Sequence, residues 1–172
     1  PGTWESGAVQ ISSWWKKKNI STFWHGASPI TIPVVSNGSG MGGKNRVSPV
    51  HIVSLLEYVN QHKTYATEYL YALSVAGIDG TLKKRFTKSH LKGMVRGKTG
   101  TLNSRGVSNL AGYIVMPEKT YCFAVLVNNK KLSQMSHWTI QQRVLEIAAP
   151  MLKKKKVTNK IRKVIKTKPV NN

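Results

Sequence analysis

The chain has 172 residues, of which 40% are hydrophobic, 27 are Lys or Arg and 6 are Asp or Glu, which gives a formal net charge of +21. This length and apolar content suffice for the core of one domain, and no apolar run is long enough to span a membrane. The positive charge attracts polyanions such as nucleic acid, anionic lipid and anionic wall polymers, although a lysine-rich genome bias explains it equally well. No zinc-finger, RNA-recognition or helix-turn-helix pattern accompanies it, so specific reading of nucleic acid is unsupported.

Apolar periodicity and capping residues predict a series of helices and strands. In chain order these are a helix over 5–17, a strand over 30–35, helices over 49–61 and 66–72, strands over 93–101, 110–116 and 121–127, and a helix over 136–149. Ser48 as N-cap and Pro49 in the first turn mark the start of the second helix. The apolar face of that helix is predicted to hold Ile52, Leu55, Leu56 and Val59.

The turn Pro117-Glu118-Lys119 predicts a hairpin between the last two strands, so the sheet is expected to be antiparallel. The last helix is expected to turn one face inward, with Pro150 ending or kinking it. That face holds Trp138, Leu145, Ala148 and Leu152. These expectations give a mixed α/β fold class, of the α+β kind, with an antiparallel sheet packed with helices.

Two regions of the chain differ in composition. Residues 1–152 are interpreted as one folded unit, whereas residues 153–172 contain nine Lys or Arg, no acidic residue and few large apolar ones. Such a segment cannot bury enough apolar surface to fold. It is therefore predicted to be a disordered basic tail, open to non-specific binding of polyanions.

The most specific motif lies at the end of the strand predicted over 93–101. It is the triplet Lys98-Thr99-Gly100, followed by Thr101. Lys98 supplies a fixed positive charge, Thr99 and Thr101 supply hydroxyl donors, and Gly100 has no side chain to block a substrate. An anionic acyl-peptide would suit such a strand, and Lys-Thr-Gly is the third signature element of penicillin-recognising serine enzymes.

Four further segments surround this triplet in a fixed order. They are Asn37-Gly38-Ser39-Gly40, Asn45-Arg46-Val47-Ser48-Pro49, the stretch 74–86 and the stretch 106–115. Together with Pro1-Gly2-Thr3-Trp4, they resemble the C-terminal half of the serine-type D-Ala-D-Ala carboxypeptidase/endopeptidase family (penicillin-binding protein 4 type). The resemblance covers residues 1 to about 150. It implies a partial penicillin-binding/serine β-lactamase-like fold, a start in mid-protein, and a location in the periplasm or cell envelope.

The resemblance also implies that the triplet Lys98-Thr99-Gly100 is the catalytic element of this chain. Lys98 would hold the terminal carboxylate of a peptidoglycan stem peptide ending in D-Ala-D-Ala, or that of a β-lactam, and Thr99 and Thr101 would donate hydrogen bonds to it. The Thr101 backbone N–H would help form the oxyanion hole, and Gly100 would leave room for the substrate. Ser39 is a further substrate-binding candidate, although its loop departs from the family pattern Asp-Gly-Ser-Gly-Leu-Ser-Arg. No cofactor is implied.

The nucleophile is expected to lie elsewhere, because the family's Ser-x-x-Lys and Ser-x-Asn motifs would precede this chain. A serine hydroxyl needs a neighbouring base, so this chain alone is expected to be inactive without its missing N-terminal half. Ser13-Trp14-Trp15-Lys16 and Tyr58-Val59-Asn60 are short fits to the same motifs, with spacing that favours chance. The alternative function is a non-catalytic cationic remnant that binds nucleic acid or cell-envelope polymers.

The remaining motifs are interpreted as structural. Gly38–Lys44 matches a phosphate-binding loop, but Asn45 replaces the hydroxyl residue that binds magnesium and the helix begins too late. Cys122 is predicted to be a buried packing residue. The histidines lack metal-ligand spacing; they are His25, His51, His62, His90 and His137. The tryptophans are predicted to be core residues rather than a sugar-stacking platform; they are Trp4, Trp14, Trp15, Trp24 and Trp138.

Overall fold

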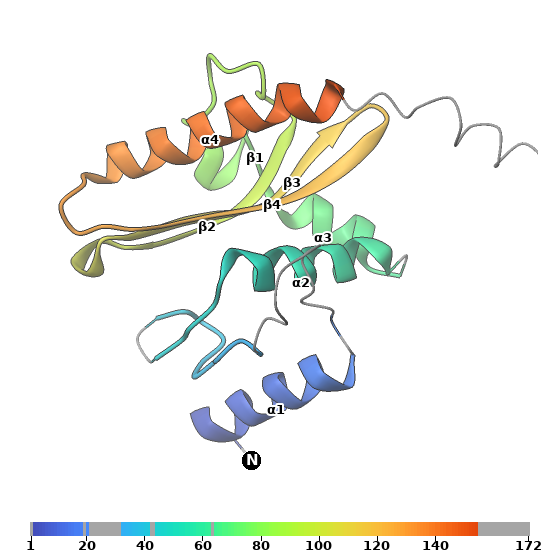
Figure 1. Cartoon of the computed structure of the whole chain (residues 1–172), viewed down its shortest axis with the longest axis vertical. Helices are drawn as coiled ribbons and strands as arrows, with labels where there is room; N and C mark the ends of the chain where they lie inside the picture. The colour runs from blue at the N-terminus through green and yellow to red at the C-terminus, as the bar shows by residue number, and fades with distance from the viewer. Residues whose placement is uncertain (1, 19, 21–31, 42–43, 63, 155–172) are drawn as a thin grey trace, which may run out of the picture.

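A sheet between layers of helices makes up the part of the chain that the structure describes (Figure 1). The structure is a computed structural model, and it describes residues 2–18, 20, 32–41, 44–62 and 64–154. α4 (Gln134–Lys154) crosses one face of the sheet, and α2 (Pro49–Gln61) and α3 (Ala66–Ala72) lie against the other. α1 (Trp4–Lys17) lies beyond α2, on the side away from the sheet.

The sheet is antiparallel throughout, as the sequence predicts. Its strands pair in chain order and are β1 (Ser74–Val75), β2 (Val95–Leu102), β3 (Val107–Met116) and β4 (Lys119–Asn128). The predicted hairpin joins β3 to β4 and pairs Met116 with Lys119. Between β2 and β3, Gly106 adopts φ 65°, and a Cβ there would lie 2.4 Å from the backbone nitrogen of Lys130. This turn therefore requires glycine.

Reciprocal caps set the starts of the first two helices. In α2, the Ser48 hydroxyl accepts from His51 N at 3.4 Å, and Ser48 N donates to His51 Nδ1 at 3.0 Å. Thr3 and Ser6 make the equivalent pair at the start of α1. Each pair satisfies backbone N–H groups that a helix start leaves without partners. The helices predicted over 5–17, 49–61 and 66–72 are confirmed.

Within the described residues, no helix has both the length and the apolar content to cross a membrane.

Two apolar clusters fill the two faces of the sheet. The cluster under α4 includes Leu82, Phe86, Leu91, Val95, Leu110, Ile114 and Leu145. The cluster on the α2 and α3 side consists of Leu56, Leu73 and Tyr113, with Ile52 packed against it. Leu56 and Ile52 belong to the face that apolar spacing predicts for α2, so that prediction is confirmed for these two residues. Leu55 and Val59 are only half-buried and do not belong to this cluster, whereas the polar residues His51 and Ser54 are buried on the same helix.

The predicted inward face of the last helix is only partly correct. Leu145 is buried and Trp138 and Ala148 are half-buried, but His137 and Gln141 are buried as well. These polar side chains have hydrogen-bond partners, which a pattern of apolar residues cannot reveal. The side chain of Leu152 lies outside the part that the structure describes.

The predicted end of the last helix and the strand predicted over 30–35 are wrong. α4 continues through Pro150 to Lys154, although a proline there removes one backbone hydrogen bond and its ring crowds the carbonyl four residues earlier. The strand predicted over 30–35 is, in its described residues 32–35, a single bridge between Val34 and Arg46. α4 also includes the first two residues of the predicted tail, and residues 155–172 lie outside the described residues.

Tyr113→Phe is expected to lower the free energy of unfolding by about 1 kcal/mol. The Tyr113 hydroxyl donates to the Leu56 carbonyl at 2.9 Å and ties β3 to α2, and burial raises the pKa of Tyr113, which keeps the donor protonated. Urea unfolding measures the change. Tyr71→Phe is the control, since Tyr71 is exposed on α3. A Tyr113→Phe variant as stable as the parent would contradict the prediction.

Candidate functional site

The Lys-Thr-Gly strand has an edge that is only half covered. β1 pairs with β2 at two positions, Ser74 with Gly97 and Val75 with Arg96. Beyond Gly97, no strand of the described residues pairs with the outer edge of β2, while the other edge is paired with β3 along the whole strand. An open strand edge presents unpaired N–H and C=O groups to a ligand.

The backbone groups at this open edge belong to the two threonines. The Val95 carbonyl accepts from Ala76 N at 2.9 Å on the β1 side. Alternate residues of a strand direct their backbone groups to the same side. The N–H and C=O groups of Thr99 and Thr101 therefore point to the open edge, whereas those of Lys98 pair with β3.

The side chains of β2 alternate between the two faces of the sheet. Arg96 lies on the α3 side, with its Cζ 4.9 Å from the centre of the Tyr71 ring. Lys98 comes two residues later and so leaves the strand on the same face, while Thr99 and Thr101 leave it on the α4 side. Lys98 is exposed, and its Nζ donates to the Thr99 carbonyl at 2.5 Å. Its ammonium group thus lies at the open edge.

Thr81 is a neighbour of the site that motif reasoning missed. The Thr99 hydroxyl donates to Thr81 Oγ1 at 3.0 Å, and Thr81 N donates to Ser74 Oγ at 3.2 Å. Gly80 allows this approach, because a Cβ there would lie 2.2 Å from Ser74 Oγ. Thr81 lies in a short 3-10 helix, Gly80–Leu82, and no motif in the sequence singles it out. The hydroxyl of Thr99 is therefore held in place before any ligand arrives.

Ser39 is not brought to this edge by any described contact. It is exposed in the loop between α1 and α2, where its hydroxyl donates to Asn37 Oδ1 at 3.2 Å and accepts from Met41 N at 3.1 Å. These contacts stay inside the loop. They support a turn-forming role for Ser39, and its predicted part in substrate binding stays a prediction.

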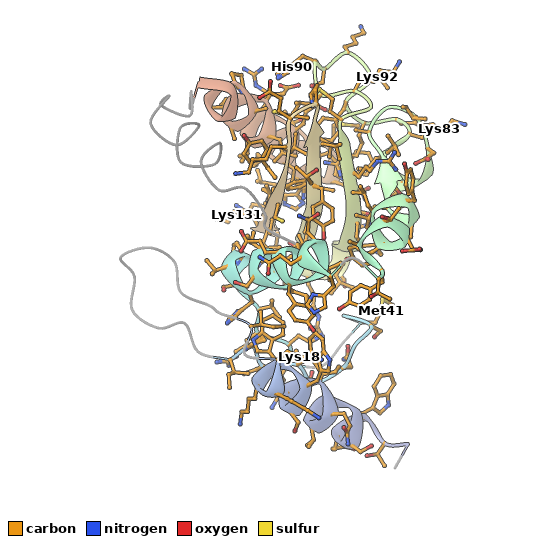
Figure 2. The ribbon with its side chains drawn as sticks, turned by 90° about the vertical axis from the view of Figure 1, so that its right-hand side faces the viewer. Lys18, Met41, Lys83, His90, Lys92 and Lys131 are labelled. Carbon is orange, nitrogen blue, oxygen red and sulfur yellow. The ribbon has the colours of Figure 1, made fainter. Side chains whose placement is uncertain are left out.

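The short fits to the nucleophile motif lie away from Lys98. Ser13 is on α1, which packs on the far side of α2 through Trp14 and Tyr58, with ring centroids 5.5 Å apart. Figure 2 shows Lys18, at the end of α1, separated from the sheet by α2. A third fit, Ser89-His90-Leu91-Lys92, lies in the loop before β2, where Ser89 Oγ accepts from Leu91 N at 3.2 Å. Figure 2 places His90 and Lys92 at the opposite end of the molecule from α1.

The other sequence motifs have structural explanations. α2 begins at Pro49, so the lysine of the apparent phosphate loop does not stand at a helix start; residues 42 and 43 of that loop lie outside the described residues. Among the described residues, no group of three His, Cys, Asp or Glu could hold a metal ion.

Cys122 and the tryptophans differ in part from expectation. Cys122 is half-buried, and burial, with a smaller contribution from the Glu57 carboxylate, raises its pKa to about 12. Its thiol is therefore protonated at neutral pH and a poor nucleophile. Trp15 is buried as predicted, but Trp4 is 68% exposed and Trp14 is 38% exposed on α1, so the core prediction is wrong for both. Trp24 and His25 lie outside the described residues.

Comparisons with known proteins find relatives in sequence and in fold. A model of the D-Ala-D-Ala carboxypeptidase 3 (S13) family matches residues 1–151. The chain is 32% identical over 133 residues to a D-alanyl-D-alanine carboxypeptidase of Actinomadura sp. (strain R39), covering 74% of this chain and 22% of that protein. It is 32% identical over 118 residues to the D-alanyl-D-alanine carboxypeptidase DacB of Haemophilus influenzae, covering 66% of this chain and 22% of that protein.

A solved structure extends the likeness to the fold. Penicillin-binding protein 4 (dacB) from Haemophilus influenzae, complexed with a β-lactam, aligns with a TM-score of 0.63 and 26% identity, covering 79% of this chain and 30% of that one. The chain thus spans about a fifth of the length of the curated relatives it matches.

Proposed function

The chain belongs to the D-Ala-D-Ala carboxypeptidase 3 (S13) family, and from this membership we propose that it forms the substrate-binding half of a serine-type D-Ala-D-Ala carboxypeptidase or endopeptidase. The substrate would be a peptidoglycan stem peptide, in the periplasm or cell envelope. The observation that carries the proposal is the open edge of β2, with the backbone groups of Thr99 and Thr101 and the ammonium of Lys98 along it.

The open edge suits an extended acyl-peptide. A peptide that adds to this edge as an antiparallel strand gains main-chain hydrogen bonds to Thr99 and Thr101. Gly100 has nothing within 4 Å of the place where a Cβ would be, so the approach on the Lys98 face stays clear. Lys98 can exchange its contact with the Thr99 carbonyl for the terminal carboxylate of the peptide, which gives a charge-assisted hydrogen bond.

The chemical step would use these groups together with a serine from outside this chain. The serine hydroxyl attacks the carbonyl of the penultimate D-Ala and gives its proton to a neighbouring base. The Thr101 N–H stabilises the developing oxyanion, the terminal D-Ala leaves as the amine, and water then hydrolyses the acyl-enzyme. The coverage of about a fifth of the relatives' length supports a nucleophile in another region.

A role in binding polyanions is favoured by one surface feature. Lys83, Lys84, Lys88 and Lys92 are all exposed in the segment before β2, at the end of the molecule that Figure 2 marks with Lys83 and Lys92. This charge would draw the protein to anionic wall polymers and is compatible with the enzymatic role.

The purified chain alone is expected to form no covalent adduct with a fluorescent penicillin, because no candidate serine in the described residues lies beside Lys98. Intact-mass spectrometry checks this result. When the chain is combined with a nucleophile-bearing region, the adduct should appear on that region. Ser13→Ala and Ser89→Ala are the controls and should change nothing. An adduct on this chain that Ser13→Ala removes would overturn the proposal.

A further inference from the structure

Arg85 is a buried charge that has no acidic partner among the described residues. It is 5% exposed, and the ion pair found among the described residues joins Arg143 to Glu146 instead. Burial lowers the pKa of Arg85 to about 10, and its Nε has no hydrogen-bond partner. Burying a charge without a counter-ion is costly, so a large apolar residue would fill this position more stably. The contacts of the guanidinium show what the arginine does there.

The guanidinium fixes the orientation of a buried amide. Arg85 Nη2 donates to Gln141 Oε1 at 2.8 Å, and the Arg85 Cζ lies 5.3 Å from the centre of the Trp138 ring. Gln141 is fully buried on α4. Because arginine can only donate, the amide oxygen must face it and the amide nitrogen must face the other way. Gln141 Nε2 accordingly donates to the Ser108 carbonyl at 2.8 Å and to the Ser108 hydroxyl at 3.2 Å.

Ser108 connects this chain of contacts to the open edge. It lies directly opposite Thr101 in the register of β2 and β3. The backbone groups of Thr101 point away from β3, so the two residues form a pair without mutual hydrogen bonds. In such pairs the Cα atoms are about 4.5 Å apart and the side chains are close. The end of β2 is thus positioned by Ser108 rather than by a neighbouring strand on its outer side.

We propose that Arg85 is a positioning residue, which acts through Gln141 and Ser108 to fix the Thr101 N–H at the open edge of β2. The inference rests on the proposed function for its catalytic meaning, but its structural content can be tested separately. A misplacement of about 1 Å in a catalytic group can slow a reaction by about 100-fold. A network that holds this N–H would therefore act on the rate of acylation more than on ligand affinity.

The decisive test is amide hydrogen exchange measured by NMR on the full chain. Gly100 and Leu102 direct their N–H groups to β3 on either side of Thr101, opposite Asn109 and Val107. Arg85→Met is expected to speed their exchange by about 10-fold and to leave the Arg96 amide unchanged. Arg143→Met, an exposed change on α4, the helix that carries Gln141, is the matched control.

Gln141→Glu separates positioning from mere packing. A carboxylate at 141 still accepts from Arg85 and gains an ion pair, but it has no N–H to donate to Ser108. It should therefore speed exchange at Gly100 and Leu102 as Arg85→Met does. Unchanged exchange in Gln141→Glu would overturn the inference, and this variant decides alone if Arg85→Met does not fold.

The acylation assay adds a second readout. In the enzyme formed with a nucleophile-bearing region, both variants are expected to slow acylation by penicillin by about 10-fold or more, with little change in affinity. The amide exchange rates and the acylation rate are independent measurements. If the parent enzyme shows no acylation, the proposed function fails, and the exchange data still decide the role of Arg85.

Discussion

Lys98→Ala is expected to slow acylation by penicillin by about 100-fold or more in the enzyme that this chain forms with a nucleophile-bearing region. Lys98 is the exposed cation at the open edge of β2, where its Nζ rests on the Thr99 carbonyl. A fixed charge aimed at the ligand carboxylate orients the acyl group beside the Thr101 N–H. Without Lys98, the ligand carboxylate is no longer attracted to the open edge and the acyl group is no longer aligned with the Thr101 N–H. The second-order rate constant of acylation, followed by fluorescence of the labelled protein, measures the effect.

Two variants make this experiment specific. Lys92→Ala removes an exposed lysine from the loop before β2 and should leave acylation unchanged, since Lys92 lies away from the open edge. Lys98→Arg keeps the charge but changes its shape and reach, so an intermediate rate is expected. Equal rates for Lys98→Ala and Lys92→Ala would refute the role of Lys98. Because Lys98 is exposed, the unfolding free energy of Lys98→Ala should match that of the parent.

Gly112→Ala is expected to lower the free energy of unfolding by about 3 kcal/mol or more. Gly112 lies opposite Gly97 in the register of β2 and β3. A Cβ at Gly112 would lie 2.0 Å from the Arg96 carbonyl oxygen and 2.7 Å from the Gly97 Cα. These neighbours are backbone atoms and cannot rotate away, so the two strands must separate. Thermal or urea unfolding gives the magnitude.

Gly100→Ala is the matched control on the same pair of strands. Nothing lies within 4 Å of a Cβ built at Gly100, so its effect on stability should stay below about 1 kcal/mol. The added methyl group would instead stand on the Lys98 face of the open edge and hinder a ligand there. A Gly112→Ala variant that is no less stable than Gly100→Ala would show that the strands adapt to the added atom.

Local sequence signals predicted most of the helices and strands, because their causes are local. Ser48 and Pro49 mark the start of α2 by their own backbone chemistry, and the Pro117-Glu118 turn joins two apolar runs at hairpin spacing. Val34 shows the limit. Its apolar neighbours read as a strand, but a strand needs a partner along its length, and the described residues give it one bridge to Arg46.

The residues of the Lys-Thr-Gly triplet could be predicted from the sequence, whereas the residues that surround the triplet in the fold could not. Lys98, Thr99 and Gly100 are contiguous, so their motif is visible in the sequence. Thr81 belongs to the site through its contact with Thr99. Arg85 contacts Gln141, which lies 56 residues after it in the chain. Such contacts depend on how α4 and the sheet meet. No periodicity or spacing within a short window encodes that arrangement.

The order of the strands has a consequence for how this sheet assembles. Each strand pairs with its neighbour in the chain, in the order β1-β2-β3-β4, and only two residues separate β3 from β4. Short loops cost little entropy to close, and a topology made of such local pairings folds faster than one that joins distant segments. The strand that carries Lys98 can therefore reach its register without waiting for a remote part of a longer polypeptide.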